Sequence, residues 1–436
     1  MEIKHISIDQ LKLDPCNPRI HSRQQVRQIA RSIKKFGFNV PILIDSTGKL
    51  LAGHGRHLAA QQLGLAEVPA IMIEHLTEAQ ARAFMLADNK LCENAEWNVE
   101  ILGEQFRQLA EVELDFELEI TGFTTGEIDV LIDGVEASAV ENRDAADELP
   151  LLGVAVTMPG DTWLLGDNRV LCSDALNPAT YAQLLEGAKA QMVFADFPYN
   201  VRIDGNVSGF GAIRHREFAM ASGEMTAEVF TDFLAGAIIM IVKNTMPGAI
   251  HFYCMDWRHV GEILDAATAA RLRQLNMCVW VKDTAGMGSL YRSQHELVFV
   301  FKNGRERHRN NVELGRYGRN RANVWNYPGA IGLRSSDEGN LVALHPTVKP
   351  VAMVADAIMD VSARGDIVLD PFLGSGTSTI ASERTGRRCY GIEIDPLYCD
   401  VIVRRWQAFT RDRAVRVADG RAFNEIEEEV KNSNAK

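Results

Sequence analysis

The segment from Asp366 to Val401 constrains the fold of this chain more than any other stretch. Its apolar run 367–370 predicts a buried strand that leads directly into the sequence PFLGSGT. Gly374 and Gly376 let the backbone turn tightly and approach a ligand, and a helix is expected to begin near Ser375. A strand that ends in such a turn is typical of an α/β protein with a ligand crevice at the end of a parallel sheet.

The spacing of an acidic residue indicates what this turn binds. Glu393 belongs to a second predicted strand, 389–394, and lies 19 residues after Gly374 (393 minus 374). Rossmann-type units place a carboxylate there to bind ribose hydroxyls. A P-loop has a Lys-Ser or Lys-Thr pair after its glycines, and this turn has none. A NAD site has a third glycine, and Thr379 occupies that position here. A lone GxG can be a helix-packing turn, but the whole succession favours a nucleoside cofactor without pyrophosphate, and S-adenosylmethionine fits.

A second turn carries residues suited to chemistry on a nucleobase. A predicted strand, 192–195, ends directly before Asp196, Phe197, Pro198 and Tyr199. An exocyclic base amine is a weak nucleophile, so an enzyme must accept hydrogen bonds from it, and a carboxylate and a backbone carbonyl can do so. A tyrosine ring on which an extruded base stacks contributes about 1 to 3 kcal/mol. Taken alone, the turn could equally be a strand end closed by an aromatic plug.

The remaining pattern predicts the fold class. Short β-rich runs alternate with helical stretches such as 227–243 and 351–363 from about residue 151 onward. Such alternation predicts an α/β fold, with a mostly parallel, doubly wound sheet and helices on both faces. The expected division is a domain over 1–90, an acidic helical connector over 91–150, a larger domain over 151–420 and a tail over 421–436.

Three motifs in one order carry a family resemblance. The order of the motifs resembles that of the permuted, beta-type DNA amino-methyltransferases, over roughly residues 155–415: first DFPY, then HPTVKP (345–350), then PFLGSGT. The resemblance implies a Rossmann-like S-adenosylmethionine-dependent domain with a target-recognition segment near 302–341. One departure is visible: the family usually has DPPY, and Phe197 replaces the first proline. This leaves the rigidity of the turn and the rate open.

The resemblance also assigns roles to residues. Asp196, Phe197, Pro198 and Tyr199 would form the catalytic turn that holds the base. Glu393 would bind ribose, Asp174 would meet the adenine side, and Lys349 would lie near the methionine part. The complete cofactor-binding set would be Asp174, Thr347, Lys349, Pro350, Asp370, Phe372, Gly374, Ser375, Gly376, Thr377 and Glu393.

The charge distribution points to DNA despite a net charge of -12. Residues 91–150 hold 17 acidic and 2 basic residues, so the rest of the chain sums to about +3. Residues 302–334 hold eight Lys or Arg and two Glu. This basic stretch is a candidate surface for contacts with DNA phosphates. The candidate DNA-binding residues are Arg305, Arg307, Arg309, Arg316, Arg319 and Arg321.

The first 90 residues read as a small α/β unit, with a strand near 1–8 and a helix over 24–36. Two motifs in this unit resemble the ParB-like nuclease and sulfiredoxin-related domains: NPR at 17–19 and LLAGHGRHLAA at 50–60. That resemblance implies a possible nucleotide site at Gly53, His54 and Arg56, where a helix begins. An adaptor or DNA-contacting role without hydrolysis is an equal alternative.

We therefore expect an adenine-N6 DNA methyltransferase acting on double-stranded DNA with S-adenosylmethionine. The alternatives are a cytosine-N4 DNA methyltransferase, a ParB-like DNA-binding regulatory protein with a degenerate methyltransferase half and, ranked lower, an RNA methyltransferase. The charged start and the absence of a long apolar run predict a cytoplasmic protein without membrane contact. Seven singly placed cysteines predict reduced thiols and no metal site. A homodimer is left open.

Overall fold

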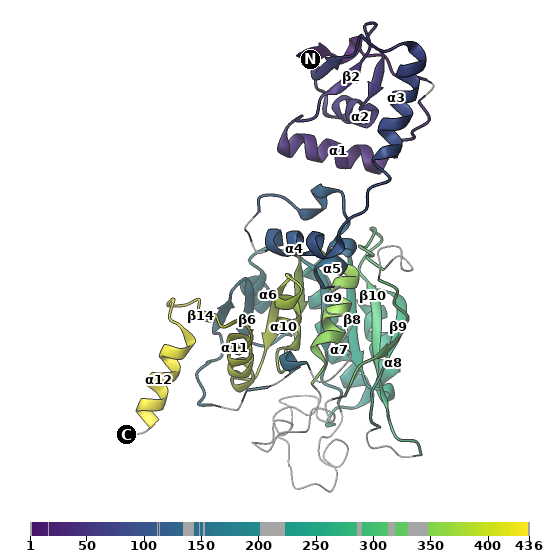
Figure 1. The fold of residues 1–436 in the computed structure, drawn as a ribbon. Helices are drawn as coiled ribbons and strands as arrows, with labels where there is room; N and C mark the ends of the chain where they lie inside the picture. Colours follow the sequence, from purple (N-terminus) through teal and green to yellow (C-terminus); the bar gives the residue numbers. More distant parts are fainter. Residues whose placement is uncertain are drawn as a thin grey trace. The chain divides into compact units, whose positions relative to one another are not determined.

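The computed structural model describes residues 2–15, 17–110, 112, 114–133, 144–147, 149–150, 153–200, 223–285, 290–312, 319–329 and 348–434. The chain divides into two compact units, Met1–Ser138 and Ala139–Lys436 (Figure 1). Within the described ranges, no helix combines the length and the apolar composition needed to cross a membrane.

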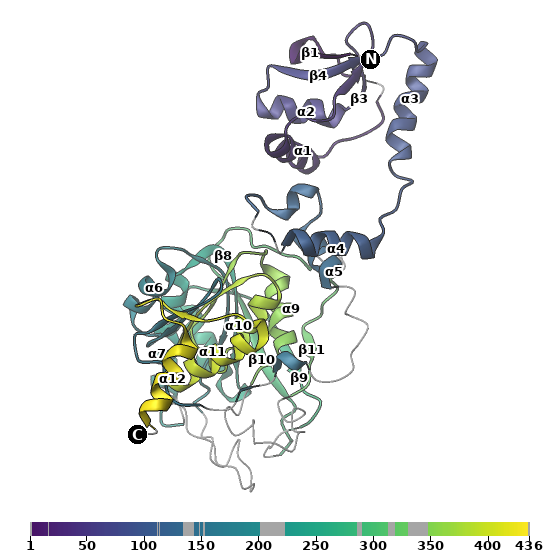
Figure 2. The same cartoon turned by 60° about the vertical axis from the view of Figure 1, so that its left-hand side comes forward.

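The first unit contains a small mixed sheet in the order β1-β4-β2-β3. These strands span Ile3–Ser7, Glu67–Met72, Ile42–Ile44 and Leu50–Ala52. Helix α1 (Arg23–Phe36) begins at Ser22, whose hydroxyl caps the amide of Gln25, and helix α2 (His54–Leu63) begins after Gly53. The two helices pack on each other on the same side of the sheet (Figure 2). The strand near residues 1–8 and the helix over 24–36 are thus confirmed.

Three further α-helices lie within the described residues of the first unit. They are α3 (Glu78–Leu91), α4 (Val99–Ala110) and α5 (Thr125–Asp133). Helices α4 and α5 pack closely because Gly103 has no side chain: a Cβ there would lie 2.4 Å from the carbonyl oxygen of Leu131. Phe106 and Phe123 add an edge-to-face contact with ring centroids 5.3 Å apart. The acidic stretch is therefore folded into packed helices over much of its length.

The second unit is built on one large sheet, in which ten strands lie within the described residues. In order across the sheet these are β11 (Val324–Asn326), β9 (Arg273–Val281), β10 (His295–Lys302), β8 (Thr245–Met255), β7 (Ala190–Asp196), β12 (Ile367–Asp370), β13 (Arg388–Glu393), β6 (Asn168–Cys172), β5 (Thr162–Leu165) and β14 (Val415–Arg416). The run from β8 to β6 is parallel throughout, which confirms the predicted sheet at its centre. On either side of this parallel centre the sheet contains antiparallel pairs. Strands β5 and β6 form one hairpin, and β9 and β10 form another.

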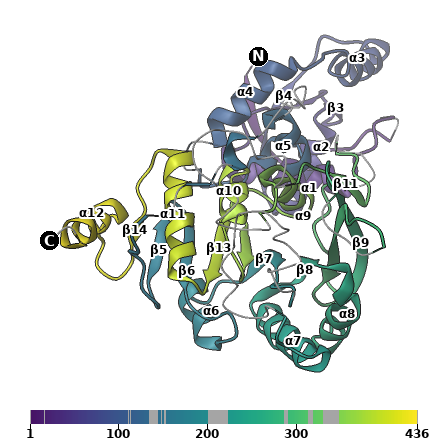
Figure 3. The same cartoon turned by 90° about the horizontal axis from the view of Figure 1, so that it is seen from below.

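Helices cover both faces of this sheet (Figure 3). One face carries α6 (Pro178–Leu185), α7 (Ala227–Lys243) and α8 (Val260–Ala269), and the other carries α9 (Val351–Val361), α10 (Thr377–Arg384) and α11 (Pro396–Thr410). Helix α12 (Phe423–Asn434) follows β14. Side chains of β7 alternate between the two cores: Val193 and Ala195 pack on the first face, Met192 and Phe194 on the second. The doubly wound α/β fold is confirmed.

The parallel centre brings the ends of distant segments together. Leu369 of β12 pairs with Val193 of β7, and Asp196 pairs with Cys254 of β8. Since parallel strands end at one edge of a sheet, the turns that follow β6, β13, β12, β7 and β8 all lie there. We call this edge the catalytic edge, because it carries the turn 196–199 that the sequence analysis predicts to hold the base.

Candidate active site

The glycine turn at the catalytic edge is held by its own aspartate. Asp370 accepts a hydrogen bond from the amide of Phe372 at 3.0 Å and another from the hydroxyl of Ser378 at 2.6 Å. Gly374 and Gly376 have φ of 52° and 80°, a region that side chains avoid. A Cβ on Gly376 would also lie 2.8 Å from Ile402. The helix begins at Thr377, two residues after the position expected from the sequence.

Glu393 closes this turn from the neighbouring strand. Its carboxylate accepts hydrogen bonds from the amides of Gly374 at 2.8 Å and Asp395 at 2.9 Å. Burial raises its pKa to about 7. Gly391 lets the turn lie close over β13, since a Cβ there would be 2.2 Å from Leu373. Each carboxylate oxygen keeps a second lone pair, which is the acceptor capacity that two ribose hydroxyls require. The turn therefore fits a nucleoside.

The aspartate-led turn follows β7, the strand beside β12. Phe197, the departure from the family pattern, is 2% exposed and packs edge-on against Tyr253 with ring centroids 5.1 Å apart. On its other side its ring centroid lies 5.0 Å from that of Phe372 in the glycine turn. The phenylalanine is thus an apolar plug that joins the two turns. The two turns do share one edge, as the sequence argument required.

A charged cluster surrounds Asp196. Lys349 contacts one of its oxygens at 2.6 Å, and the hydroxyl of Tyr199 donates to the other at 2.7 Å. A Glu296 oxygen lies 3.1 Å from the same hydroxyl, so the two carboxylates share its single proton. The Glu296 carboxylate also contacts Lys349 at 3.1 Å and Lys282 at 2.5 Å. Two carboxylates therefore face two ammonium groups, and the opposite charges balance.

Burial and pairing act against each other in this cluster. Burial raises the pKa of Asp196, and the positive charge of Lys349 opposes that rise. Burial alone would also raise the pKa of Glu296, but Lys349 and Lys282 outweigh it and lower that pKa to about 2. Both carboxylates raise the pKa of Lys349 against the effect of burial. Lys349 is 4% exposed, so little water screens these interactions.

Sequence reasoning missed Glu296 and Lys282. Both stand at the ends of apolar strands, Glu296 in HELVFVFK and Lys282 directly after RQLNMCVWV. A charge at the end of a buried strand was the available signal, but the sequence does not say which strands are neighbours. Lys349 was expected near the cofactor, and the structure pairs it with Asp196.

The other expected cofactor residues lie around these turns. Asp174 follows β6 at the same edge and accepts from the amide of Leu176 at 2.8 Å. Thr377 donates its hydroxyl to the carbonyl of Lys349 at 3.2 Å, and Pro350 caps α9. The carbonyl of Ser375 accepts from the buried Arg405 at 3.0 Å. Thr347 lies outside the described residues.

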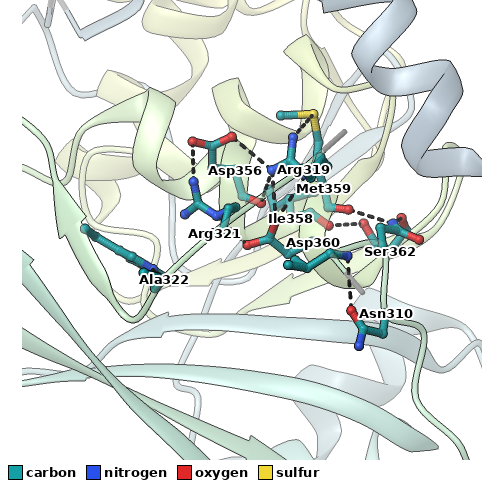
Figure 4. A network of polar contacts seen from close by, with 12 residues as sticks. Asn310, Arg319, Arg321, Ala322, Asp356, Ile358, Met359, Asp360 and Ser362 are labelled. Carbon is teal, nitrogen blue, oxygen red and sulfur yellow. Dashed lines mark hydrogen bonds and ion pairs between the residues drawn. The ribbon is translucent and has the colours of Figure 1, made fainter. Parts of the chain in front are cut away.

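Two of the candidate DNA-binding arginines are engaged inside the second unit. Arg319 contacts Asp356 at 3.0 Å and Asp360 at 2.9 Å, both on helix α9 (Figure 4). Arg321 contacts the same two carboxylates, each at 2.8 Å. The Arg319 side chain is 9% exposed. These arginines therefore fasten the segment around them to α9, which leaves them poorly placed to contact phosphate.

The remaining candidates lie elsewhere. Arg305, Arg307 and Arg309 follow the far end of β10, where the amide of Gly248 donates to the carbonyl of Asn303 at 2.7 Å. This is the start of β8, hence the edge opposite the catalytic edge. A contact with DNA bound at the catalytic edge stays a prediction for them, and their position argues against it. Arg316 lies outside the described residues.

In the first unit, the expected nucleotide residues gather where α2 begins. His54 and His57 are 7% and 1% exposed. His54 Nε2, His57 Nδ1 and Arg56 Nε are buried without a hydrogen-bond partner. Gly53 precedes them with φ of 94°, and no side chain caps the helix. No cluster of His, Cys, Asp or Glu suited to a metal ion occurs within the part of the chain that the structure describes.

The fold thus places a glycine turn that fits a nucleoside beside a carboxylate-led turn. Residues 190–404 match the N6/N4 family of DNA methylases, and residues 1–90 match the ParB N-terminal domain. Residues 100–159 match the helix-turn-helix domain of ParB-methyltransferases, a module that the acidic composition had concealed. Residues 190–404 are therefore a DNA methylase domain of the N6/N4 family, whose cofactor is S-adenosylmethionine, and residues 1–90 are a ParB N-terminal domain.

Individual relatives match parts of the chain. The ParB-like nuclease domain-containing protein YnaK of Escherichia coli (strain K12) is 48% identical over 64 residues, 15% of this chain and 74% of that protein. The orphan methyltransferase M.BamHII of Bacillus amyloliquefaciens is 36% identical over 85 residues, 20% of this chain but only 31% of that protein. The solved M1.HpyAVI-SAM complex is 18% identical with a TM-score of 0.40, covering 54% of this chain and 97% of that chain.

The ion pairs of Arg319 and Arg321 predict a stability effect. The double variant Arg319→Met/Arg321→Met leaves Asp356 and Asp360 without their cations, and removing the partners of buried charges costs about 3 to 5 kcal/mol. We expect the free energy of unfolding to fall by that amount in urea titrations. The exposed pair Arg305→Met/Arg307→Met is the matched control and should change it by less than about 0.5 kcal/mol. Equal effects of the two double variants would contradict the fastening role.

Proposed function

We propose that this protein transfers a methyl group from S-adenosylmethionine to the N6 amine of adenine in double-stranded DNA. The observation that carries the proposal is the junction of the two turns through Phe197 and Phe372, with ring centroids 5.0 Å apart. An aspartate at the first position of the catalytic turn favours adenine in the family that the chain resembles. Cytosine-N4 is the alternative for the base, and the experiment below distinguishes the two.

The cofactor would be held by the glycine turn and Glu393. The amides and carboxylates described above suit a nucleoside, and Asp370 keeps the turn in shape through Phe372 and Ser378. When bound, the cofactor supplies a methyl group on a positively charged sulfur. Ionised Glu393 is the stronger acceptor for ribose hydroxyls, so its pKa of about 7 favours cofactor binding above neutrality.

The base would be held by Asp196 and Tyr199. Asp196 accepts a hydrogen bond from the amine and then takes the proton that the methylated amine releases. Tyr199 donates to Asp196 at 2.7 Å, so the arriving amine would replace that hydroxyl and leave the tyrosine ring to stack on the base. The positive charge of Lys349 favours the ionised form of Asp196, and Glu296 holds Lys349 in place.

Replacing the acceptor tests the enzyme directly. Asp196→Asn keeps the shape but loses the charged acceptor, so methyl incorporation into unmethylated plasmid DNA should fall by about 100-fold or more. The exposed Asp265→Asn on α8 serves as the control and should keep full incorporation. Digestion of the product to nucleosides then identifies N6-methyladenine or N4-methylcytosine. Undiminished incorporation by Asp196→Asn, or none by the wild type, would defeat the proposal.

The ion pair with Lys349 predicts a change in pH dependence. Lys349→Met removes the charge that opposes the burial of Asp196, so the pKa of Asp196 rises further and less of it is ionised at neutral pH. The acidic limb of the single-turnover rate should move to higher pH, with the largest loss below neutrality and partial recovery above it. Lys243→Met, at the exposed end of α7, should leave the profile unchanged. A uniform loss at every pH would argue against the charge-holding role.

The first unit supports a second candidate function. We propose that Gly53, His54 and Arg56 bind the phosphates of a nucleotide, as the ParB-like resemblance implies. The supporting observation is the set of buried ring and guanidinium nitrogens without partners at the start of α2. Backbone amides at a helix start attract anions, and a phosphate there would satisfy these groups.

Nucleotide binding should appear as stabilisation. A nucleoside triphosphate at 100 times its Kd should add about 2.7 kcal/mol to the stability of a protein that binds it only when folded. We expect thermal unfolding of the wild type to shift upward, and Arg56→Ala to remove the shift. Arg82→Ala, on the exposed side of α3, is the control that should keep it. The same shift in Arg56→Ala and in the wild type would place the nucleotide elsewhere.

A further inference from the structure

The catalytic edge carries large apolar side chains that face solvent. Strand β8 ends at Met255, and Trp257 follows with 50% of its surface exposed. The guanidinium of Arg258 lies over the Trp257 ring, 5.4 Å from its centroid. In the connection between β9 and β10, Leu290 and Tyr291 are 84% and 85% exposed. Leu290 and Tyr291 are adjacent, and two adjacent apolar side chains that are exposed to solvent indicate a surface that a partner covers.

The register of the strands places these residues beside the catalytic turn. Asp196 pairs with Cys254, so Trp257 lies just beyond the level of the catalytic aspartate. Leu297 pairs with Met255 and His295 pairs with Val281, so residues 282–285 and 290–294 lie past the same edge. Lys282, directly after β9, and Glu296, near the start of β10, form a 2.5 Å ion pair.

That ion pair belongs to the cluster around Asp196. Glu296 also contacts Lys349, which holds Asp196. The connection that presents Leu290 and Tyr291 is therefore fastened to the catalytic cluster at its base. A partner that covers these side chains would lie at the mouth of the site where the base enters.

Duplex DNA is the partner that these residues fit. A base taken out of the helix leaves a gap in the stack, and apolar side chains that enter such a gap recover part of the lost contact energy. Trp257 and Tyr291 offer faces for stacking, and Arg258 offers a cation beside an aromatic ring. The far-edge arginines, Arg305, Arg307 and Arg309, cannot supply this surface at the catalytic edge.

We infer that Trp257, Arg258, Leu290 and Tyr291 form the surface that receives duplex DNA, and that Leu290 and Tyr291 occupy the space left by the everted base. This inference rests on the proposed function, because it requires methyl transfer to a base that leaves the duplex.

The test compares two DNA substrates that differ only at the target. In one, the target base is paired, and in the other it faces an abasic position, so that no pair has to be opened. We expect Leu290→Ala/Tyr291→Ala to lower kcat/KM on the paired substrate by about 10-fold or more, and on the unpaired substrate by about 3-fold or less. Trp257→Ala should weaken binding of both duplexes, measured by fluorescence anisotropy, by about 10-fold.

Matched controls come from exposed apolar residues away from this edge. Leu275→Ala, near the start of β9, and Phe409→Ala, near the end of α11, should behave like the wild type on both substrates. The Leu290→Ala/Tyr291→Ala variant should keep the thermal unfolding midpoint of the wild type, because both side chains are more than four-fifths exposed.

The outcomes separate the inference from the function on which it rests. Equal losses on the two substrates, or no loss, with an active wild type would overturn the gap-filling role alone. Unchanged duplex binding by Trp257→Ala would remove that residue from the surface. Tighter binding of single-stranded RNA than of duplex DNA by the wild type would overturn the assignment of the partner. No methylation of either substrate by the wild type would overturn the proposed function itself.

Discussion

The parallel pairing of β7 with β12 is the constraint on which the site depends. These strands come from segments about 170 residues apart (Leu369 against Val193), yet their register brings Asp196 and the glycine turn to one edge. A slip by one residue would turn every side chain of a strand to the opposite face, and the two sheet cores would lose their alternating apolar sets. Phe197 and Phe372 then join the turns by a contact that needs both strands in place. The catalytic geometry is thus a consequence of how the core is packed.

Charged residues in the second unit serve structure as much as binding. The charges around Asp196 neutralise one another in a site that excludes much of the water; the other members are Glu296, Lys282 and Lys349. In the same way, Arg319 and Arg321 neutralise two carboxylates of helix α9. Buried pairs of this kind fix geometry because a lone charge there is costly. Meanwhile the edge that holds the catalytic turn presents aromatic and aliphatic side chains to solvent. Two arginines of the basic stretch, Arg319 and Arg321, therefore stabilise the fold of the second unit.

Much of the fold could be predicted from the sequence. The strand Ile367–Asp370 and the helix Ala227–Lys243 have the bounds expected from their apolar patterns, because both patterns depend on near neighbours in the chain. Glu393 could be paired with Gly374 for the same reason, since one strand-turn-helix-strand unit contains both. Glu296 could not be found, because its partners come from the residue after β9, from the turn after β7 and from the segment just before α9. Helices were expected over 91–150, but the helix-turn-helix domain within 100–159 was not, because an acidic composition says nothing about how α4 and α5 pack.

By itself, the sequence determined the local units: which stretches are strands, where glycines must turn, and which acid follows a turn at the spacing of a ribose ligand. Those properties depend on periodicity and on backbone freedom, which are local. Tertiary structure alone decided which charges meet. In the folded protein Lys349 pairs with Asp196, and Arg319 and Arg321 form ion pairs with α9. Arg305 lies at the edge opposite the catalytic turn. The physical reason is that electrostatic pairing depends on distance in space, and only the order of strands in the sheet sets that distance.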